Sequence, residues 1–166
     1  MKKIFLFFSL LALTLITHAQ KDNQLVTFDN LGPFKLGMSK AELEKLVGAK
    51  IVLKHIRIDE AFTETVKVMY KGSEYDLDLG INDKVEAQLE GVSSSSPLYK
   101  TAEGIGIGSD LETIVNTYEK HMLIITAGTI TYANIDNIHA SIVFYMEGKK
   151  VVKIEVEPTA AFLDRE

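Results

Sequence analysis

The chain has 166 residues, of which 46% are hydrophobic, and it carries a formal net charge of −5 at neutral pH. An acidic chain disfavours nucleic acid as a partner, because binding there depends on a surface rich in Lys and Arg, and it also disfavours anionic membrane surfaces. Because the sequence contains no Cys, disulfides, thiolate metal sites and a Cys nucleophile are excluded.

The first 19 residues are predicted to form a signal peptide. Lys2 and Lys3 precede an apolar run over residues 4–17, and residues 17–19 place small side chains at the two positions that a signal peptidase reads. The run is shorter than the ~20 apolar residues that a membrane-spanning helix needs, which disfavours the alternative of a membrane anchor. We therefore expect cleavage after Ala19, a secreted protein that is periplasmic or extracellular, and no transmembrane segment after removal of the signal.

The mature chain is predicted to begin with a short strand at 25–28 and a turn at 30–33, followed by a helix. Ser39 and Glu42 have the spacing of a capping box, in which the Ser hydroxyl accepts from a backbone N–H and the Glu reaches back to the N–H of the capping residue. Gly48 ends the helix. The helix is expected to be amphipathic, with a buried stripe of Leu43, Leu46 and Val47.

Four strands are predicted next, at 51–58, 65–70, 74–81 and 85–90, with a hairpin at 82–84. The first two are rich in β-branched and aromatic residues, and the last two alternate between apolar and polar residues. We expect the apolar side chains to point toward a covered face and the polar ones toward water. The polar residues predicted on the open side are Glu74, Asp76, Asp78, Glu86, Gln88 and Glu90.

Residues 93–97, Ser-Ser-Ser-Ser-Pro, are predicted to be a flexible connector because of their composition. Ser109 or Asp110 then caps a second helix. The apolar side of that helix carries Leu111, Ile114, Val115 and Tyr118. Strands are expected at 122–127, 129–135, 140–146 and 151–157, with a last hairpin at 147–150 and a loose tail at 158–166.

Residues 34–48 and 105–118 align without a gap, and Gly37 matches Gly108 at a tight turn before each helix. The other matched pairs are Phe34 with Ile105, Leu36 with Ile107, Leu43 with Ile114 and Val47 with Tyr118. We interpret the chain as a tandem duplication, with a first repeat at 20–92 and a second at 98–157. The predicted fold class is α+β: two tandem helix-plus-antiparallel-strand repeats that form a continuous sheet with the helices on one face.

The segment at 36–48, Leu-Gly-Met-Ser-Lys-Ala-Glu-Leu-Glu-Lys-Leu-Val-Gly, and its second copy at 107–118 resemble the turn and helix of the β-lactamase inhibitor protein type of fold. The small lipoprotein of the outer-membrane barrel-assembly machinery shares that fold as a single unit. The resemblance implies a module that binds other proteins through its open sheet face or edge loops, with no catalytic residues. This chain departs from the inhibitor in lacking Cys pairs and from the lipoprotein in lacking a lipidation Cys.

The acidic residues of the alternating strands are the first candidates for chemistry. A hard cation such as Ca²⁺ takes several oxygen ligands, but no Asp-x-Asp-x-Asp-Gly loop brings such ligands close together. A general acid/base pair is disfavoured, since nothing in the pattern desolvates one carboxylate and leaves another ionised. A solvated sheet face is the favoured interpretation, and we expect neither a metal nor a cofactor.

The histidines of the mature chain, His55, His121 and His139, are the next candidates. No two of them have the i, i+4 spacing of a metal site, and no Gly-x-Ser-x-Gly motif is present, although a dispersed Ser–His–acid set remains an alternative. The glycines at 104–108 do not form a phosphate-binding loop, because the Gly-x-Gly-x-x-Gly order is absent and no Lys follows the last glycine.

The strands at 140–146 and 151–157 supply a further candidate surface. If the apolar residues at 142, 144 and 146 face the helices, Val143 and Tyr145 lie on the open face beside Lys153 and Glu155. Tyr145 is then either an anchor for a protein partner or one member of a cross-strand packing pair. The predicted partner-binding residues are therefore Glu74, Asp76, Asp78, Glu86, Gln88, Glu90, Val143, Tyr145, Lys153 and Glu155.

These patterns favour a non-enzymatic binding module that recognises a protein partner with a basic patch through its open face or loops. One alternative is an envelope structural or assembly factor, which would associate stably with membrane complexes. The other is a small-ligand carrier or hydrolase, in which the sheet and loops enclose a pocket lined by His55 or His139 together with carboxylates.

Overall fold

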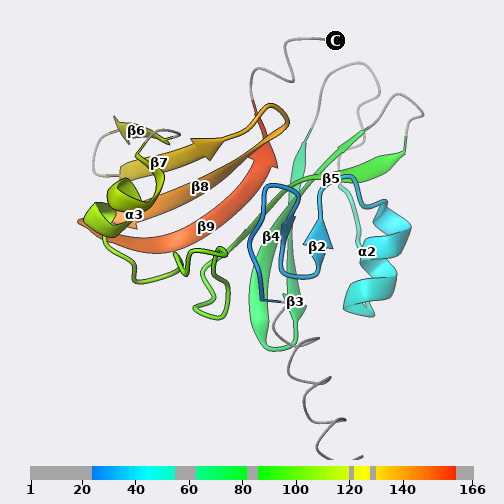
Figure 1. The fold of residues 1–166 in the computed structure, drawn as a ribbon. Coiled ribbons are helices and arrows are strands. Elements are labelled where there is room, and N and C mark those ends of the chain that lie inside the picture. The colour runs from blue at the N-terminus through cyan, green and yellow to red at the C-terminus, as the bar shows by residue number, and fades with distance from the viewer. Residues whose placement is uncertain (1–23, 55–62, 82–85, 120–121, 128–129, 160–166) are drawn as a thin grey trace, which may run out of the picture.

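The computed structural model describes residues 24–54, 63–81, 86–119, 122–127 and 130–159. Within them the fold is α+β, with two helices packed against a seven-stranded antiparallel sheet, as predicted (Figure 1). In this part of the chain no helix is long and apolar enough to cross a membrane. The predicted signal peptide, His55, His121, the hairpin at 82–84 and residues 160–166 of the tail lie outside the described residues.

The strands of the sheet follow the order β3-β4-β5-β9-β8-β7-β6, and all neighbours are antiparallel. A separate two-stranded ribbon joins β1 (Asn30–Leu31) and β2 (Phe34–Lys35). The bounds of the main strands are β3 (Glu64–Tyr70), β4 (Ser73–Ile81), β5 (Ala87–Ser94), β6 (Met122–Ala127), β7 (Ile130–Asp136), β8 (Ala140–Glu147) and β9 (Lys150–Pro158).

Three sequence predictions of local structure differ from what the described residues show. Ser93 and Ser94, assigned to a flexible connector, are buried residues of β5. The segment at 51–54, assigned to the start of a strand, has no strand structure, and the predicted strand at 25–28 consists only of isolated bridges at Leu25 and Val26. For Ser93 and Ser94 the pairing with β9, rather than the local composition, decides the structure.

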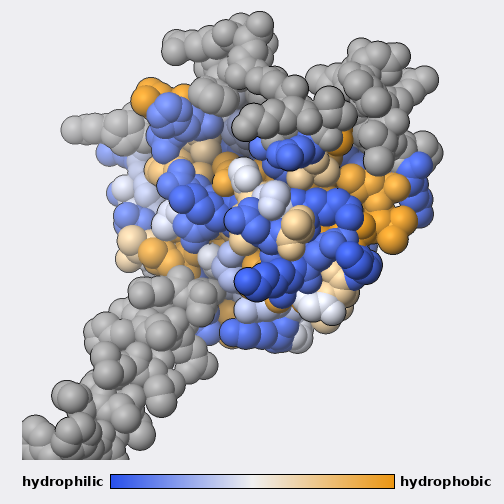
Figure 2. Space-filling model, turned by 90° about the vertical axis from the view of Figure 1, so that its right-hand side faces the viewer, coloured by the Kyte–Doolittle hydropathy of each residue, from blue (hydrophilic) through white to orange (hydrophobic). Residues whose placement is uncertain are grey.

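The two helices begin in different ways. Helix α2 (Lys40–Val47) has the predicted capping box: Ser39 Oγ accepts from the Glu42 N–H and the Glu42 carboxylate accepts from the Ser39 N–H. Helix α3 (Leu111–Tyr118) begins at Asp110, whose side chain makes no capping hydrogen bond and instead pairs with Lys150 at 2.7 Å. Figure 2 views the side of the molecule that carries α2 and shows hydrophilic residues over its centre and a hydrophobic patch toward the right-hand edge.

Gly37 and Gly108 have equivalent surroundings, as the alignment predicted. Their φ angles are +81° and +86°, in the left-handed region that favours glycine. The Gly37 N–H donates to the Leu89 carbonyl at 2.7 Å, and the Gly108 N–H donates to the Val151 carbonyl at 2.8 Å. Each turn is therefore held against the last strand of its own half of the chain.

The equivalence continues along β5 and β9. One residue beyond Leu89 and Val151, each strand has a bulge, at Glu90 and Val152. Where the two strands pair, Ser93 lies opposite Glu155, and the flanking pairs are Val92 with Val156 and Ser94 with Ile154. Counted from the two bulges, Ser93 and Glu155 are equivalent positions, so an approximate two-fold axis passes between them. The repeat boundaries at 20–92 and 98–157 remain predictions.

The hydrophobic core lies on one face of the sheet. Leu43 of α2 and Ile114 of α3 are both fully buried in it, so both helices cover this face, as predicted. Figure 1 shows α2 beside the strands of the first half and α3 beside those of the second. The inward residues of the sheet include Tyr75, Leu77, Leu79, Leu89, Val92, Ala133, Ile135, Ile142, Phe144, Met146, Ile154 and Val156.

Candidate functional site

One row of side chains crosses all seven strands on the face opposite the helices. Direct cross-strand partners share a face, and they alternate along each strand with the core residues. Both described helices pack against the other side of the sheet, and we call the side that carries this row the open face. The row runs from β3 to β6 through Lys67, Asp76, Ser93, Glu155, Val143, Asn134 and Leu123.

The β4 part of the open face is acidic, as predicted. Glu74, Asp76 and Asp78 alternate with buried apolar residues of β4. Lys67 of β3 pairs with Glu74 at 3.0 Å and with Asp76 at 2.8 Å, and these two carboxylates, Asp76 most strongly, raise the pKa of Lys67. Asp78 accepts a hydrogen bond of 2.5 Å from the Thr65 hydroxyl. Sequence reasoning missed Lys67, whose positive charge partly neutralises the carboxylates of β4.

The three predicted residues around the start of β5 have different environments. Glu86 is exposed and precedes the strand, while Gln88 pairs with Gly80 of β4. Glu90 is the bulged residue, and its carboxylate accepts a 3.2 Å hydrogen bond from the Thr63 hydroxyl. Burial, with a smaller contribution from the charge of Asp78, raises the pKa of Glu90.

The carboxylates of the open face are spread along the strands rather than gathered around one point. Among the described residues, no group of three His, Cys, Asp or Glu side chains is arranged to hold a metal ion. His139 lies in the turn before β8, where its N–H donates to the Asn137 side chain at 2.7 Å. Its backbone carbonyl accepts from the Thr159 N–H at 3.1 Å.

The predicted residues of β8 and β9 form a connected cluster. The Tyr145 ring packs edge-on against Tyr132 at 5.0 Å between centroids, and Lys153 Nζ lies 4.1 Å from the centre of the Tyr145 ring. The Tyr145 hydroxyl donates to Glu155, which also lies 3.5 Å from Lys153 Nζ. Burial and then the Glu155 contact raise the pKa of Tyr145. Tyr145 is thus a packing partner as well as a surface residue.

Two of the predicted contact residues have little accessible surface. Val143 lies on the predicted side of the sheet but is only 3% exposed, and Glu155 is 8% exposed. They form the floor of the open face instead of its contact surface. Beside them Glu157 is partly buried, and burial together with the charges of Glu155, Asp78 and Asp136 raises its pKa.

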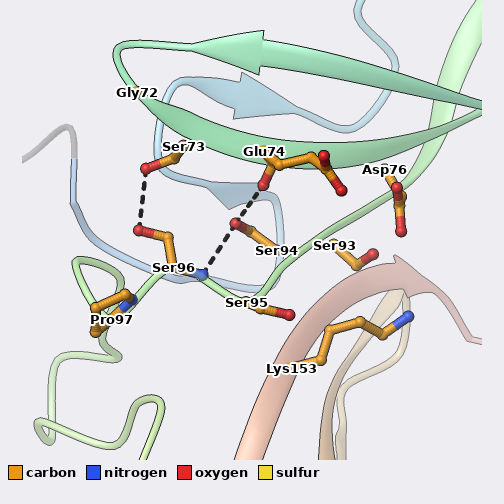
Figure 3. Close-up of a pocket in the computed structure, with 10 residues that line it drawn as sticks. All are labelled: Gly72, Ser73, Glu74, Asp76, Ser93, Ser94, Ser95, Ser96, Pro97 and Lys153. Carbon is orange, nitrogen blue, oxygen red and sulfur yellow. Dashed lines mark hydrogen bonds between the residues drawn. The ribbon is translucent and has the colours of Figure 1, made fainter.

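A polar pocket opens where β4, β5 and β9 meet (Figure 3). Its volume is about 320 Å³, and it is lined by residues 72–74, Asp76, residues 93–97 and Lys153. The Ser94 hydroxyl donates to the Glu74 carbonyl at 2.7 Å, and the Ser73 and Ser96 hydroxyls are 3.0 Å apart. Sequence reasoning found Glu74, Asp76 and Lys153 but missed the serines of the pocket. Those at 93–96 belong to a segment whose composition predicts only a flexible connector.

The comparisons with known proteins identify the fold but no family for this chain. No protein-family model matches it, and no curated protein matches it significantly. The structure is similar to the crystal structure, at 2.13 Å resolution, of YjgB, a DUF4309 family protein from Bacillus subtilis subsp. subtilis str. 168, with a TM-score of 0.51. The similarity covers 86% of this chain and 92% of that one at 6% sequence identity, so it concerns the fold alone.

Proposed function

We propose that the protein is a secreted, non-enzymatic binding module that recognises a partner protein through the open face. The observation that carries this proposal is the row of side chains from Lys67 to Leu123, which crosses seven strands with no described helix packed over it. A sheet that is covered on one face only usually leaves the other to solvent or to a partner. The resemblance to the β-lactamase inhibitor protein type of fold supports the same use of this face.

The charge of the open face indicates the kind of partner. Among the described residues, Lys67 and Lys153 carry ammonium groups on the central part of this face, and both are already engaged by carboxylates of the same face. A basic surface would therefore meet a complementary potential, which promotes association and selects against acidic partners. The described carboxylates of this face include Glu74, Asp76, Asp78, Glu90, Asp136, Glu147, Glu155 and Glu157.

Neutralising two carboxylates of β4, those of Asp76 and Asp78, tests this proposal. The chain from residue 20 onward is immobilised and used to capture proteins from the secreted or envelope fraction of the producing cells, beside the variant Asp76→Asn/Asp78→Asn. We expect capture to fall at least about tenfold, the equivalent of about 1.4 kcal/mol, and to weaken with added salt because exposed charges are screened.

A matched control removes two charges from the helix side. Glu112 of α3 and Glu119, which ends that helix, are exposed, so Glu112→Gln/Glu119→Gln changes the net charge equally without touching the open face. The proposal requires this variant to capture as much as the unaltered protein. Equal recovery by the two double variants would count against the open face.

The pocket in Figure 3 favours a second candidate function, the carriage of a small polar ligand. Its hydroxyl groups and its Lys153 ammonium offer both donors and acceptors. The substitution Ser95→Trp would fill the pocket with a large ring. Loss of binding to a small molecule, with protein capture unchanged, would support the carrier function; loss of protein capture would place the pocket within the protein-binding surface.

A further inference from the structure

Strand β6 is an exposed, apolar edge of the sheet. Leu123 is 54% exposed, and Ile124 and Ile125 are each 43% exposed. The pairing of Leu123 with Asn134 and of Ile125 with Tyr132 places both side chains on the open face, whereas Ile124 pairs with the buried Ala133 and lies on the helix side. Both sides of β6 therefore expose aliphatic surface.

Strand β6 ends the sheet, and in the described part of the chain no strand pairs with its outer edge. Its sequence, Met-Leu-Ile-Ile-Thr-Ala, contains no charged residue, Pro or Gly. Charges, Pro and bulges are the features by which edge strands usually avoid pairing with another chain. An uncharged aliphatic edge is thus competent for strand addition.

The opposite edge of the sheet differs. On the open face, the central residue of strand β3 is Lys67, which forms ion pairs with Glu74 and Asp76. The polar residue Thr65 lies on the same face of β3. A lysine on an edge strand discourages pairing with another sheet. The contrast indicates that the two edges have different roles and that only β6 is suited to a partner strand.

We propose that β6 pairs antiparallel with β6 of a second copy of this chain and joins the two sheets edge to edge. A strand that is uncharged and apolar on both faces would cover the exposed aliphatic side chains of β6, and the same strand of a second copy meets both conditions. An isologous two-fold contact also closes after two copies. The observations that carry the proposal are the aliphatic exposure on both faces of β6 and its lack of charge.

The faces of the two copies restrict the register. A two-fold axis perpendicular to the sheet places the open faces of both copies on the same side of the joined sheet. Residues that pair across the contact must therefore point to the same face in both copies. Centred on Ile124, the contact pairs Ile124 with Ile124 of the second copy on the helix side, and Leu123 with Ile125 on the open face. Within one chain, β5 and β9 already pair about such an approximate axis.

The first test is the mass of the protein in solution, measured by sedimentation equilibrium for the chain from residue 20 onward. We expect a dimer whose dissociation constant rises at least about tenfold in Ile124→Lys, because like charges directly opposite each other repel. Met69→Lys is the matched control, since Met69 is an exposed apolar residue (61%) of the other edge. A protein that is monomeric at all concentrations, or a dimer weakened equally by both substitutions, would overturn the proposal.

A second test does not require destabilising the strand. The natural sequence has no Cys, so Ile124→Cys introduces a single thiol that the proposed register places opposite its own copy, within reach of a disulfide. Oxidation should give a covalent dimer from Ile124→Cys several-fold faster than from Met69→Cys. Equal rates for the two variants would contradict β6 pairing. Failure of Ile124→Cys to cross-link, with the protein nevertheless dimeric, would exclude this register and overturn the proposal.

Discussion

The carboxyl group of Glu90 lies directly over Gly80 on the open face. A Cβ atom added to residue 80 would stand 1.9 Å from Glu90 Cδ and from one of its carboxylate oxygens. The absence of a side chain at residue 80 therefore leaves the space that the bulged Glu90 occupies. Glycine here makes room for the carboxylate in this position and does not serve a special backbone angle.

Substitution of Gly80 should therefore change the titration of Glu90. In Gly80→Ala the Glu90 carboxylate must move outward into water, so its raised pKa should fall toward the ordinary value for Glu, about 4.3. Carboxyl ¹³C chemical shifts followed against pH would measure this. The pKa of Glu157, whose charged neighbours do not include Glu90, should stay unchanged and serves as the internal control. An unaltered Glu90 pKa would show that the carboxylate does not occupy this space.

Glu157 should destabilise the fold at neutral pH. Because its pKa is raised in the folded protein, its contribution to stability is fully present below the unfolded pKa, about 4.3, and is lost as the pH rises through the folded pKa. Glu157→Gln should thus increase the free energy of unfolding at pH 7 by more than at pH 4, as measured by urea denaturation. Glu112→Gln, on the exposed side of α3, is the control. An equal gain at both pH values would refute the proposed cause.

The two helix starts should differ in their sensitivity to alanine. Ser39→Ala removes the capping box of α2 and should lower the free energy of unfolding by about 1 kcal/mol. Asp110→Ala removes an exposed ion pair with Lys150 but no capping hydrogen bond, so its cost should stay below about 1 kcal/mol. Denaturant unfolding compares the two variants. A larger loss in the free energy of unfolding for Asp110→Ala than for Ser39→Ala would contradict the stronger capping of α2.

Removing the Tyr145 hydroxyl should destabilise the floor of the open face. In Tyr145→Phe the nearly buried Glu155 loses a hydrogen-bond donor, and we expect a loss of about 1–3 kcal/mol in the free energy of unfolding. Tyr132→Phe keeps both that hydrogen bond and the ring contact with Tyr145, and should cost less. If both variants unfold at the same denaturant concentration as the unaltered protein, the hydrogen bond contributes nothing to stability.

The sequence predicted those features that depend on local periodicity or backbone geometry. Alternation at 74–81 predicted the faces of β4, because one face of that strand is buried and the side-chain period is two. The match of Gly37 with Gly108 predicted two equivalent turns, because both positions require a positive φ. Alternation along the other strands likewise predicted that Gln88, Val143 and Glu155 lie opposite the core side.

The features that the sequence did not predict depend on contacts between distant strands. Ser93 belongs to a polar serine run, and only the pairing of β5 with β9 places it opposite Glu155 in the middle of the sheet. The burial of Glu155 likewise accompanies a contact across strands, the hydrogen bond from the Tyr145 hydroxyl. The pairing of β5 with β9 joins strands from different halves of the chain, and no local pattern encodes it.

Site-specific photo-crosslinking in the producing cells tests the central proposal most directly. A photoreactive amino acid replaces Lys67 or Tyr132 on the open face, or Thr113, an exposed residue of α3, as the control. The proposed function predicts a specific cross-linked partner protein from both open-face positions and none from position 113. Cross-links to a partner that form only from position 113, or equally from all three positions, would contradict recognition through the open face.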